Sequence, residues 1–193
     1  MSDTRVAPGQ QHLIDGPRIY LREVTRADAT DRYRDWLNDP QVNRFLETRF
    51  ETQTRDRILD YIDAQASAPD AVFLAIVRRS DEQHLGNLRI GTIDPVHRTA
   101  TLALVIGDKS AWGAGIGTEA IELATRYAFE HLDLRKLTAR CYAVNLASIR
   151  AFEKAGWTRE GIQREQFLCD GVAIDGVWLG RVRGQAASRG GAA

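Results

Sequence analysis

The spacing of apolar and polar residues changes several times along the chain, so both helices and strands are expected. Residues 18–24 alternate apolar and polar side chains, which is typical of a half-buried strand. Thr25 is placed to cap a helix that begins near Arg26 and ends at an Asn-Asp-Pro sequence, because proline restricts the residue before it. A short helix over 42–46 and a longer one over 52–65, with its apolar residues on one face, follow.

The middle of the chain is dominated by strand-forming residues. Residues 71–77 are an apolar run, residues 85–93 alternate, and residues 99–106 are rich in β-formers. Asp94-Pro95 marks a turn between the last two segments, so we expect them to pair antiparallel.

The last third contains a single strand-helix-strand crossover followed by a hairpin. Cys169-Asp170-Gly171 provides the hairpin turn. Strands early and one crossover late predict an α/β (α+β) fold, a mixed and mostly antiparallel sheet covered by helices. The expected elements are a helix over 118–131, a strand over 137–142, a helix over 148–154, and strands over 158–168 and 173–182.

Composition limits the possible classes of partner. The chain has 193 residues, enough for one well-buried domain, which we expect over 16–183, with a flexible leader over 1–15 and a flexible tail over 184–193. Lys and Arg together number 26, as do Asp and Glu. This balance gives no overall field to attract nucleic acid or an anionic membrane, so neither is expected as a partner.

The chain shows no targeting or metal-binding pattern. Its N-terminal residues lack the basic-then-apolar order of a signal peptide, and no apolar run approaches the roughly 20 residues of a membrane helix. Cys141 and Cys169 are too few for a disulfide framework and lack metal-ligand spacing. We therefore expect reduced thiols, no metal and a cytoplasmic location.

A glycine-rich turn, Gly113-Ala114-Gly115-Ile116-Gly117, precedes the helix expected over 118–131. Alternating glycines let a ligand approach the backbone and expose N–H groups at the positive end of a helix, which suits phosphate or pyrophosphate. A tight turn that needs positive φ angles explains the glycines equally well. A P-loop is excluded because Thr118-Glu119 follows where Lys-Ser/Thr is needed, and the G-x-G-x-G spacing is not the dinucleotide fingerprint.

A second group of residues follows the strand over 137–142. Asn145, Ser148 and Phe152 lie at i, i+3 and i+7, which places them on one face of a helix, and Gly156 suits the position that ends it. The simpler interpretation is an Asn cap with a Ser in the first helical turn.

Together, Trp112–Ala120 and Asn145–Trp157 resemble the GNAT acetyltransferase superfamily, most closely its Rim-type branch of ribosomal-protein N-acetyltransferases. The resemblance covers residues 18–182. It implies a GNAT-like twisted mixed sheet of six to seven strands, splayed in the middle between residues 102–106 and 137–142 and flanked by about four helices. A homodimer is also consistent with it, since dimers are common in the superfamily.

The resemblance implies acetyl-CoA as co-substrate, with no metal. Its pyrophosphate would lie on the N–H groups of the glycine turn, its pantetheine along the strand that ends at Ile106, and its thiol beside the helix bearing Ser148. Asn145 would hydrogen-bond the pantetheine. The implied cofactor-binding residues are Leu104, Val105, Ile106, Trp112, Gly113, Ala114, Gly115, Ile116, Gly117, Thr118, Asn145, Ser148 and Phe152.

The sequence departs from its relatives at the proton-transfer positions. Many relatives carry a Tyr acid where this chain has Phe152, so Ser148 is the candidate acid and Tyr142 the reserve. Rim-like sequences usually carry a Glu where this chain has Thr101, so the base is open and Glu47 is a candidate substitute. Trp112, where many relatives have Gln or Arg, matters less because the turn binds through its backbone.

The acceptor is expected between the early helices and the last hairpin. Arg49 is suited to a phosphate or carboxylate on the acceptor, although a surface ion pair is an alternative. These features predict an N-acetyltransferase for a primary amine, either a small molecule such as an amino sugar or polyamine, or a protein N-terminus. A catalytically degenerate acyl-CoA-binding module is the alternative. The candidate substrate-binding residues are Arg49, Phe50, Arg89 and Phe167.

Overall fold

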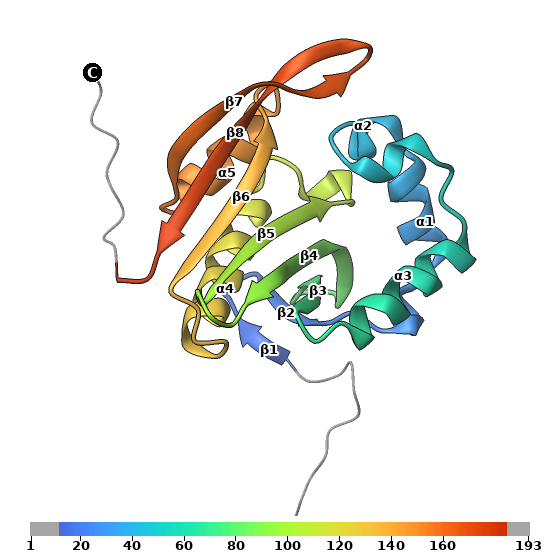
Figure 1. Cartoon of the computed structure of the whole chain (residues 1–193). Helices are drawn as coiled ribbons and strands as arrows, with labels where there is room; N and C mark the ends of the chain where they lie inside the picture. The colour runs from blue at the N-terminus through green and yellow to red at the C-terminus, as the bar shows by residue number, and fades with distance from the viewer. Residues whose placement is uncertain (1–11, 185–193) are drawn as a thin grey trace, which may run out of the picture.

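The computed structural model describes residues 12–184, which form one eight-stranded sheet with helices on both faces (Figure 1). The strand order is β1-β2-β3-β4-β5-β6-β8-β7. The strands are β1 (His12–Asp15), β2 (Ile19–Glu23), β3 (Ala71–Arg78), β4 (Gln83–Asp94), β5 (Thr99–Ile106), β6 (Lys136–Tyr142), β7 (Thr158–Cys169) and β8 (Val172–Val182), and the α-helices are α1 (Asp31–Asn38), α2 (Pro40–Asn43), α3 (Arg55–Ser67), α4 (Ile116–Glu130) and α5 (Leu146–Lys154).

Strands β1 to β5 form an antiparallel run in chain order. Asp94 pairs with Thr99, so the turn expected at Asp94-Pro95 does join antiparallel strands. β1 was not expected: its four residues fall in the segment predicted as a leader, and they form an edge strand on β2. A strand this short carries too little periodicity to be detected. The remainder of the expected leader and most of the expected tail lie outside the described residues.

Two apolar layers cover the two faces of the sheet. The larger lies under α4 and α5 and includes Leu88, Leu102 and Phe152. The smaller lies under α1 and α3 and includes Trp36 and Ile62. Because neighbouring residues of a strand point to opposite faces, β2 and β3 contribute apolar side chains to both layers, whereas β4 and β5 contribute theirs to the larger one.

The helix predicted from Arg26 is interrupted. Residues Arg26–Asp28 form a single 3₁₀ turn, in which Asp28 Oδ2 accepts the Thr25 N–H at 2.8 Å. The α-helix α1 begins later, where Thr30 Oγ1 accepts the Tyr33 N–H at 3.3 Å. Asp28 also accepts two hydrogen bonds from Arg22 of β2, a tertiary contact that fixes the turn in place and that the local sequence does not reveal.

β5 and β6 are parallel neighbours that separate after a short contact. Their pairing covers Thr99–Thr101 against Lys136–Thr138 and then stops, so the strands diverge over the remainder of each, as expected. β8 lies between β6 and β7, and the β7–β8 turn has positive φ at Asp170 and Gly171, the geometry of a two-residue type I′ hairpin.

The observed fold is the mixed, mostly antiparallel sheet that the sequence predicted. It has one strand more than the upper expectation, because β1 was missed, and five α-helices among the described residues where about four were expected. None of the helices within residues 12–184 has both the length and the apolar character required to cross a membrane.

Candidate active site

The glycine turn lies between β5 and α4. Gly113 and Gly115 have φ of +72° and +78°, so these two positions do require glycine for conformational reasons. α4 begins at Ile116, and its first intrahelical bond runs from the Glu119 N–H to the Gly115 carbonyl at 3.1 Å. The N–H groups of Ile116, Gly117 and Thr118 therefore stand at the open end of the helix.

Arg18, immediately before β2, donates hydrogen bonds to carbonyl groups of this turn. Its guanidinium donates to the Ala114 carbonyl and, at 3.3 Å, to the Gly115 carbonyl. The C=O and N–H of a trans peptide point in opposite directions. The N–H groups of Gly115 and Ile116 consequently face away from Arg18, which presents them to a ligand.

Glu119 positions Arg18. The residue is only 6% exposed, and its carboxylate accepts the Arg18 Nε–H at 2.6 Å as well as the backbone N–H groups of Arg18 and Ile19 at 2.9 and 3.2 Å. Its main role in the structure is to connect α4 to the first residues of β2.

The surroundings of Gly117 show whether the turn fits a phosphate group. This residue lies in the first turn of α4 without positive φ, and a Cβ added there would meet only Ile106 Cγ1, at an ordinary 3.8 Å. Neither backbone strain nor packing requires glycine here, although glycine weakens a helix by about 0.5–1 kcal/mol relative to alanine. Close approach of a ligand explains the missing side chain, so the turn fits a phosphate group.

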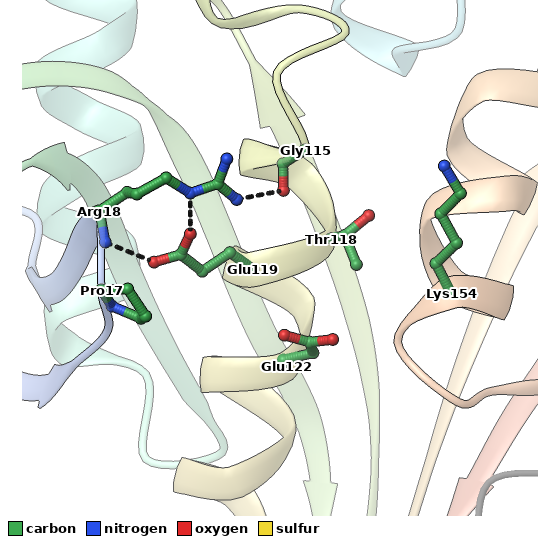
Figure 2. Close-up of a pocket in the computed structure, with 7 residues that line it drawn as sticks. All are labelled: Pro17, Arg18, Gly115, Thr118, Glu119, Glu122 and Lys154. Carbon is green, nitrogen blue, oxygen red and sulfur yellow. Dashed lines mark hydrogen bonds and ion pairs between the residues drawn. The ribbon is translucent and has the colours of Figure 1, made fainter.

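A pocket of about 390 Å³ lies beside the turn, over the first turns of α4, with Pro17 and Arg18 on one side and Lys154 of α5 on the other (Figure 2). Lys154, at the end of α5, faces Thr118 of α4 across this space. Lys154 was not selected from the sequence, although its place at the end of the second motif helix was a usable signal. The residues that line the pocket are Pro17, Arg18, Gly115, Thr118, Glu119, Glu122 and Lys154.

Trp112 connects the turn to β5. Its indole Nε1–H donates to the Ile106 carbonyl at 2.8 Å, and the side chain is 44% exposed. Beyond Thr101, the edge of β5 that faces β6 has no strand partner. Backbone groups along Leu104–Ile106 on that edge are therefore available to an extended ligand, as in strand addition.

Asn145 and Ser148 lie where β6 meets α5. Asn145 Oδ1 accepts the Ser148 N–H at 3.2 Å, so Asn145 is the N-cap that the simpler interpretation proposed. The Ser148 hydroxyl lies 3.4 Å from the Cys141 sulfur. Burial raises the pKa of the Cys141 thiol, and the Ser148 contact offsets this only in part. Phe152, 2% exposed, packs against Trp157 in the larger apolar layer.

Across the sheet, four candidate residues from distant parts of the chain come together. Tyr142 stacks on Phe167 with ring centroids 4.0 Å apart, donates its hydroxyl to Glu47 Oε1 at 3.0 Å and accepts from Arg49 at 2.9 Å. Arg49 also donates to the Leu168 carbonyl at 2.9 Å. These bonds join the segment after α2 to the tip of the β7–β8 hairpin.

The electrostatics of this cluster keep Tyr142 protonated. Burial raises the pKa of Tyr142, donation from Arg49 lowers it, and the neighbouring Glu47 carboxylate raises it, with a net upward shift. Phe50 is 66% exposed beside the Arg49 guanidinium, which lies 4.1 Å from the ring centroid.

Arg89 and Thr101 lie apart from this cluster. Arg89 of β4 donates its Nε–H to Gln65 of α3 at 2.6 Å. The Thr101 hydroxyl is exposed and lies 3.4 Å from that of Thr138. The structure thus places a neutral pair where relatives were expected to carry a carboxylate.

The comparisons with known proteins agree with this architecture. The family model of the acetyltransferase (GNAT) domain matches residues 18–158. The chain therefore belongs to the GNAT acetyltransferase family and is an acetyltransferase.

Curated relatives agree with this assignment. The Bacillus subtilis protein named "Probable N-acetyltransferase YjcK" is 30% identical over 175 residues, 86% of this chain and 92% of that protein. Spermidine N(1)-acetyltransferase of Escherichia coli K12 is 31% identical over 91 residues, 47% of this chain and 48% of that protein.

The fold of the chain is shared with solved acetyltransferases. Spermidine N-acetyltransferase of Vibrio cholerae, in complex with CoA and spermine, superposes with a TM-score of 0.76 at 19% identity, over 86% of this chain and 95% of that one. A Vibrio cholerae protein assigned as a ribosomal-protein-serine acetyltransferase has a TM-score of 0.70 at 20% identity, over 91% and 99% of the two chains. At these identities the likeness concerns the fold alone. The shared fold with the second protein agrees with the Rim-type resemblance of the sequence.

Proposed function

We propose that this protein transfers an acetyl group from acetyl-CoA directly to a primary amine. The observation that carries the proposal is the glycine turn at the open end of the β5–β6 splay, with its carbonyls held by Arg18 and its N–H groups facing outward. Such a turn binds pyrophosphate through backbone donors at a helix N-terminus. Residues 113–118 would hold the pyrophosphate, and Lys154 is placed to contact a phosphate of the nucleotide.

The remaining cofactor contacts follow the splay. The unpaired edge of β5 at Leu104, Val105 and Ile106 would hold the pantetheine by backbone hydrogen bonds, and the thiol end would reach Ser148 of α5. Trp112 would bound the site at the turn, and Phe152 would support α5 from within the apolar layer. The Asn145 side-chain oxygen caps α5, and its Nδ2–H groups would donate to the pantetheine.

Acetyl-CoA supplies the thioester, and the protein positions its reactants. A backbone N–H on the edge of β5 would stabilise charge that develops on the carbonyl oxygen. Ser148 would donate a proton to the departing sulfur, with Tyr142 as reserve. Tyr142 is the weaker candidate because its hydroxyl is already donated to Glu47 and its pKa is raised. Glu47 would accept a proton from the amine.

The acceptor would bind on the opposite face of the sheet from α4. Arg49, Phe50 and Phe167 would line it near the hairpin tip, and Arg89 would line it at β4. Polyamine acetyltransferases among the relatives and fold neighbours support an amine acceptor, and a small molecule or a protein N-terminus remains the proposed range.

Release of free thiol tests the proposal. The protein is incubated with acetyl-CoA and, separately, with polyamines, amino sugars, amino acids and N-terminal peptides. Turnover with at least one amine is expected. Tight acetyl-CoA binding without turnover across the panel would instead favour a catalytically degenerate acyl-CoA-binding module, the second candidate, for which Thr101 and Phe152 in place of Glu and Tyr are the supporting observations.

A further inference from the structure

The arginines on the proposed acceptor face differ from most others in the protein. Within residues 12–184, twelve arginines take part in ion pairs with carboxylates, for example Arg22 with Asp28. Arg49, Arg89 and Arg140 are among the nine arginines in this part of the chain that form none. The polar partners of Arg49 are two carbonyls and a hydroxyl, and that of Arg89 is a neutral amide.

Strand register places Arg89 and Arg140 on one face of the sheet. The Thr101 and Thr138 hydroxyls lie 3.4 Å apart, so both side chains point to the same face. Two residues further along β5 and β6 are Ala103 and Arg140, which share that face because strand side chains alternate. Ala103 pairs with Arg89 of β4. The two arginines therefore share a face of the sheet, although their guanidiniums point apart. That of Arg89 lies beside Gly91 and donates to Gln65 of α3. That of Arg140 lies near Trp178 of β8.

Arg140 and Arg49 belong to the same surface. Tyr142, two residues after Arg140, shares its face, and the ring of Phe167 stacks on Tyr142. The Arg140 guanidinium lies 5.1 Å from the centroid of Phe167, and Arg49 donates to the Tyr142 hydroxyl. Arg140 is exposed and, among the described residues, makes no hydrogen bond. Its guanidinium lies near the rings of Phe167 and Trp178, and its donors are available to a ligand.

We infer that the acceptor is a small primary amine that carries a carboxylate or phosphate, which Arg140 binds with support from Arg49; this inference rests on the proposed function. A guanidinium presents paired N–H donors that match either oxyanion. One carboxylate of the early helices, Glu47, reaches this surface, and it is engaged by Tyr142.

The same charges disfavour a polyamine and help the reaction. Spermidine, the acceptor named for one relative, carries several positive charges and would meet the cations of Arg140 and Arg49 here. Neighbouring positive charge lowers the pKa of an amine, because like charges disfavour the protonated form. The arginines thus increase the neutral, nucleophilic fraction of the bound amine, at a site where Thr101 stands in place of a carboxylate base.

Matched acceptors test the inference. Rates of thiol release are compared for glucosamine 6-phosphate and glucosamine, for 4-aminobutyrate and 4-aminobutyramide, and for spermidine. We expect kcat/KM to be about 10- to 100-fold higher for the anionic member of at least one pair, the size of a charge-assisted hydrogen bond. The pair that shows the preference distinguishes phosphate from carboxylate. Equal rates within both pairs, or the highest rate with spermidine, would overturn the inference while leaving the acetyltransferase proposal intact.

Variants attribute the preference to Arg140. Arg140→Gln keeps part of the side-chain stem and is expected to abolish the preference by raising KM for the anionic acceptor, with KM for acetyl-CoA unchanged. Arg140→Lys should retain part of it, because the charge remains without the planar donor pair. Arg98→Gln, at the opposite end of β5 and paired with Asp133, is the control for net charge and should leave the preference in place.

A binding measurement separates this inference from the proposed function. With CoA present, glucosamine 6-phosphate or 4-aminobutyrate should raise the thermal midpoint of the wild type but not of Arg140→Gln. If no acceptor is acetylated, the proposed function fails and this measurement alone judges the anion site. No shift with either compound in the wild type refutes the anion site.

Discussion

Arg18 Nε lies 2.6 Å from Glu119 Oε2, although the two residues are 101 positions apart in the chain. This contact joins the beginning of β2 to the first turn of α4. The same arginine holds two carbonyls of the glycine turn. A single ion pair therefore connects sheet packing to the orientation of the N–H groups that we assign to the pyrophosphate.

Glu119→Gln should weaken both stability and acetyl-CoA binding. We expect the free energy of unfolding to fall by about 1–2 kcal/mol, less than the roughly 3–5 kcal/mol for breaking a fully buried pair, because the Arg18 side chain is 52% exposed. Chemical denaturation and titration with acetyl-CoA measure the two effects. Glu130→Gln, at the exposed end of the same helix, is the matched control. Loss of stability without loss of affinity would mean that Arg18 does not orient the turn.

Gly117→Ala should separate binding from stability. The added methyl group meets only Ile106 Cγ1 at 3.8 Å, and alanine favours a helix by up to about 1 kcal/mol, so stability should hold or rise. Acetyl-CoA affinity should nevertheless fall by about tenfold or more, a steric cost of roughly 1.4 kcal/mol. Gly115→Ala is the comparison: at φ +78° it should lose about 1–2 kcal/mol of stability. Unaltered affinity in Gly117→Ala would exclude close phosphate approach at this residue.

Ser148→Ala should lower kcat with little effect on KM for acetyl-CoA. If its hydroxyl protonates the departing sulfur, the loss should be about 100-fold, within the usual range for a general acid. Steady-state kinetics by thiol release measures both constants. Tyr142→Phe keeps the stack on Phe167 and removes the bonds to Glu47 and Arg49, so it tests the reserve. A large loss in Tyr142→Phe with normal Ser148→Ala kinetics would reverse the assignment.

His84 should make the fold acid-sensitive. Burial lowers the pKa of His84, against the opposing effects of Asp28 and Asn87, whereas the unfolded chain protonates near the ordinary value of 6.5. Below that pH the unfolded state binds more protons, so stability is lost as the pH falls, by up to about 1.4 kcal/mol per pH unit for one group. Thermal midpoints from pH 8 to pH 5 measure this decline.

A variant identifies the titrating group. His84→Gln retains a side chain able to donate to Asn87 Oδ1, which His84 Nε2 approaches at 2.9 Å, and cannot titrate. Its stability should vary less between pH 7 and pH 5 than that of the wild type. Parallel curves for the two proteins would assign the acid sensitivity to another group, for instance Asp28. Burial raises the pKa of Asp28, but the bonds from Arg22 and Thr25 outweigh burial, so the net shift is downward.

Elements with a strong local pattern were predictable, and those that depend on distant partners were not. The alternation along β4 and β5 correctly predicted two strands, and the Asp-Gly sequence correctly predicted the turn of the last hairpin. β1 was missed because four residues carry little periodicity. The helix expected from Arg26 was wrong in its beginning, since Asp28 binds Arg22 of a strand and leaves Thr30 to cap α1.

The candidate site divides in the same way. The sequence by itself determined the glycine turn and the Asn145–Ser148 helix start, because both depend on backbone conformation and on residues a few positions apart. Only the tertiary structure could bring Arg18 to the turn, or Glu47, Arg49, Tyr142 and Phe167 to one cluster. The tertiary structure also decided which arginines form ion pairs with carboxylates and which, like Arg140, do not. Those contacts join segments about a hundred positions apart, and their energies depend on sheet register and strand divergence, which no local pattern encodes.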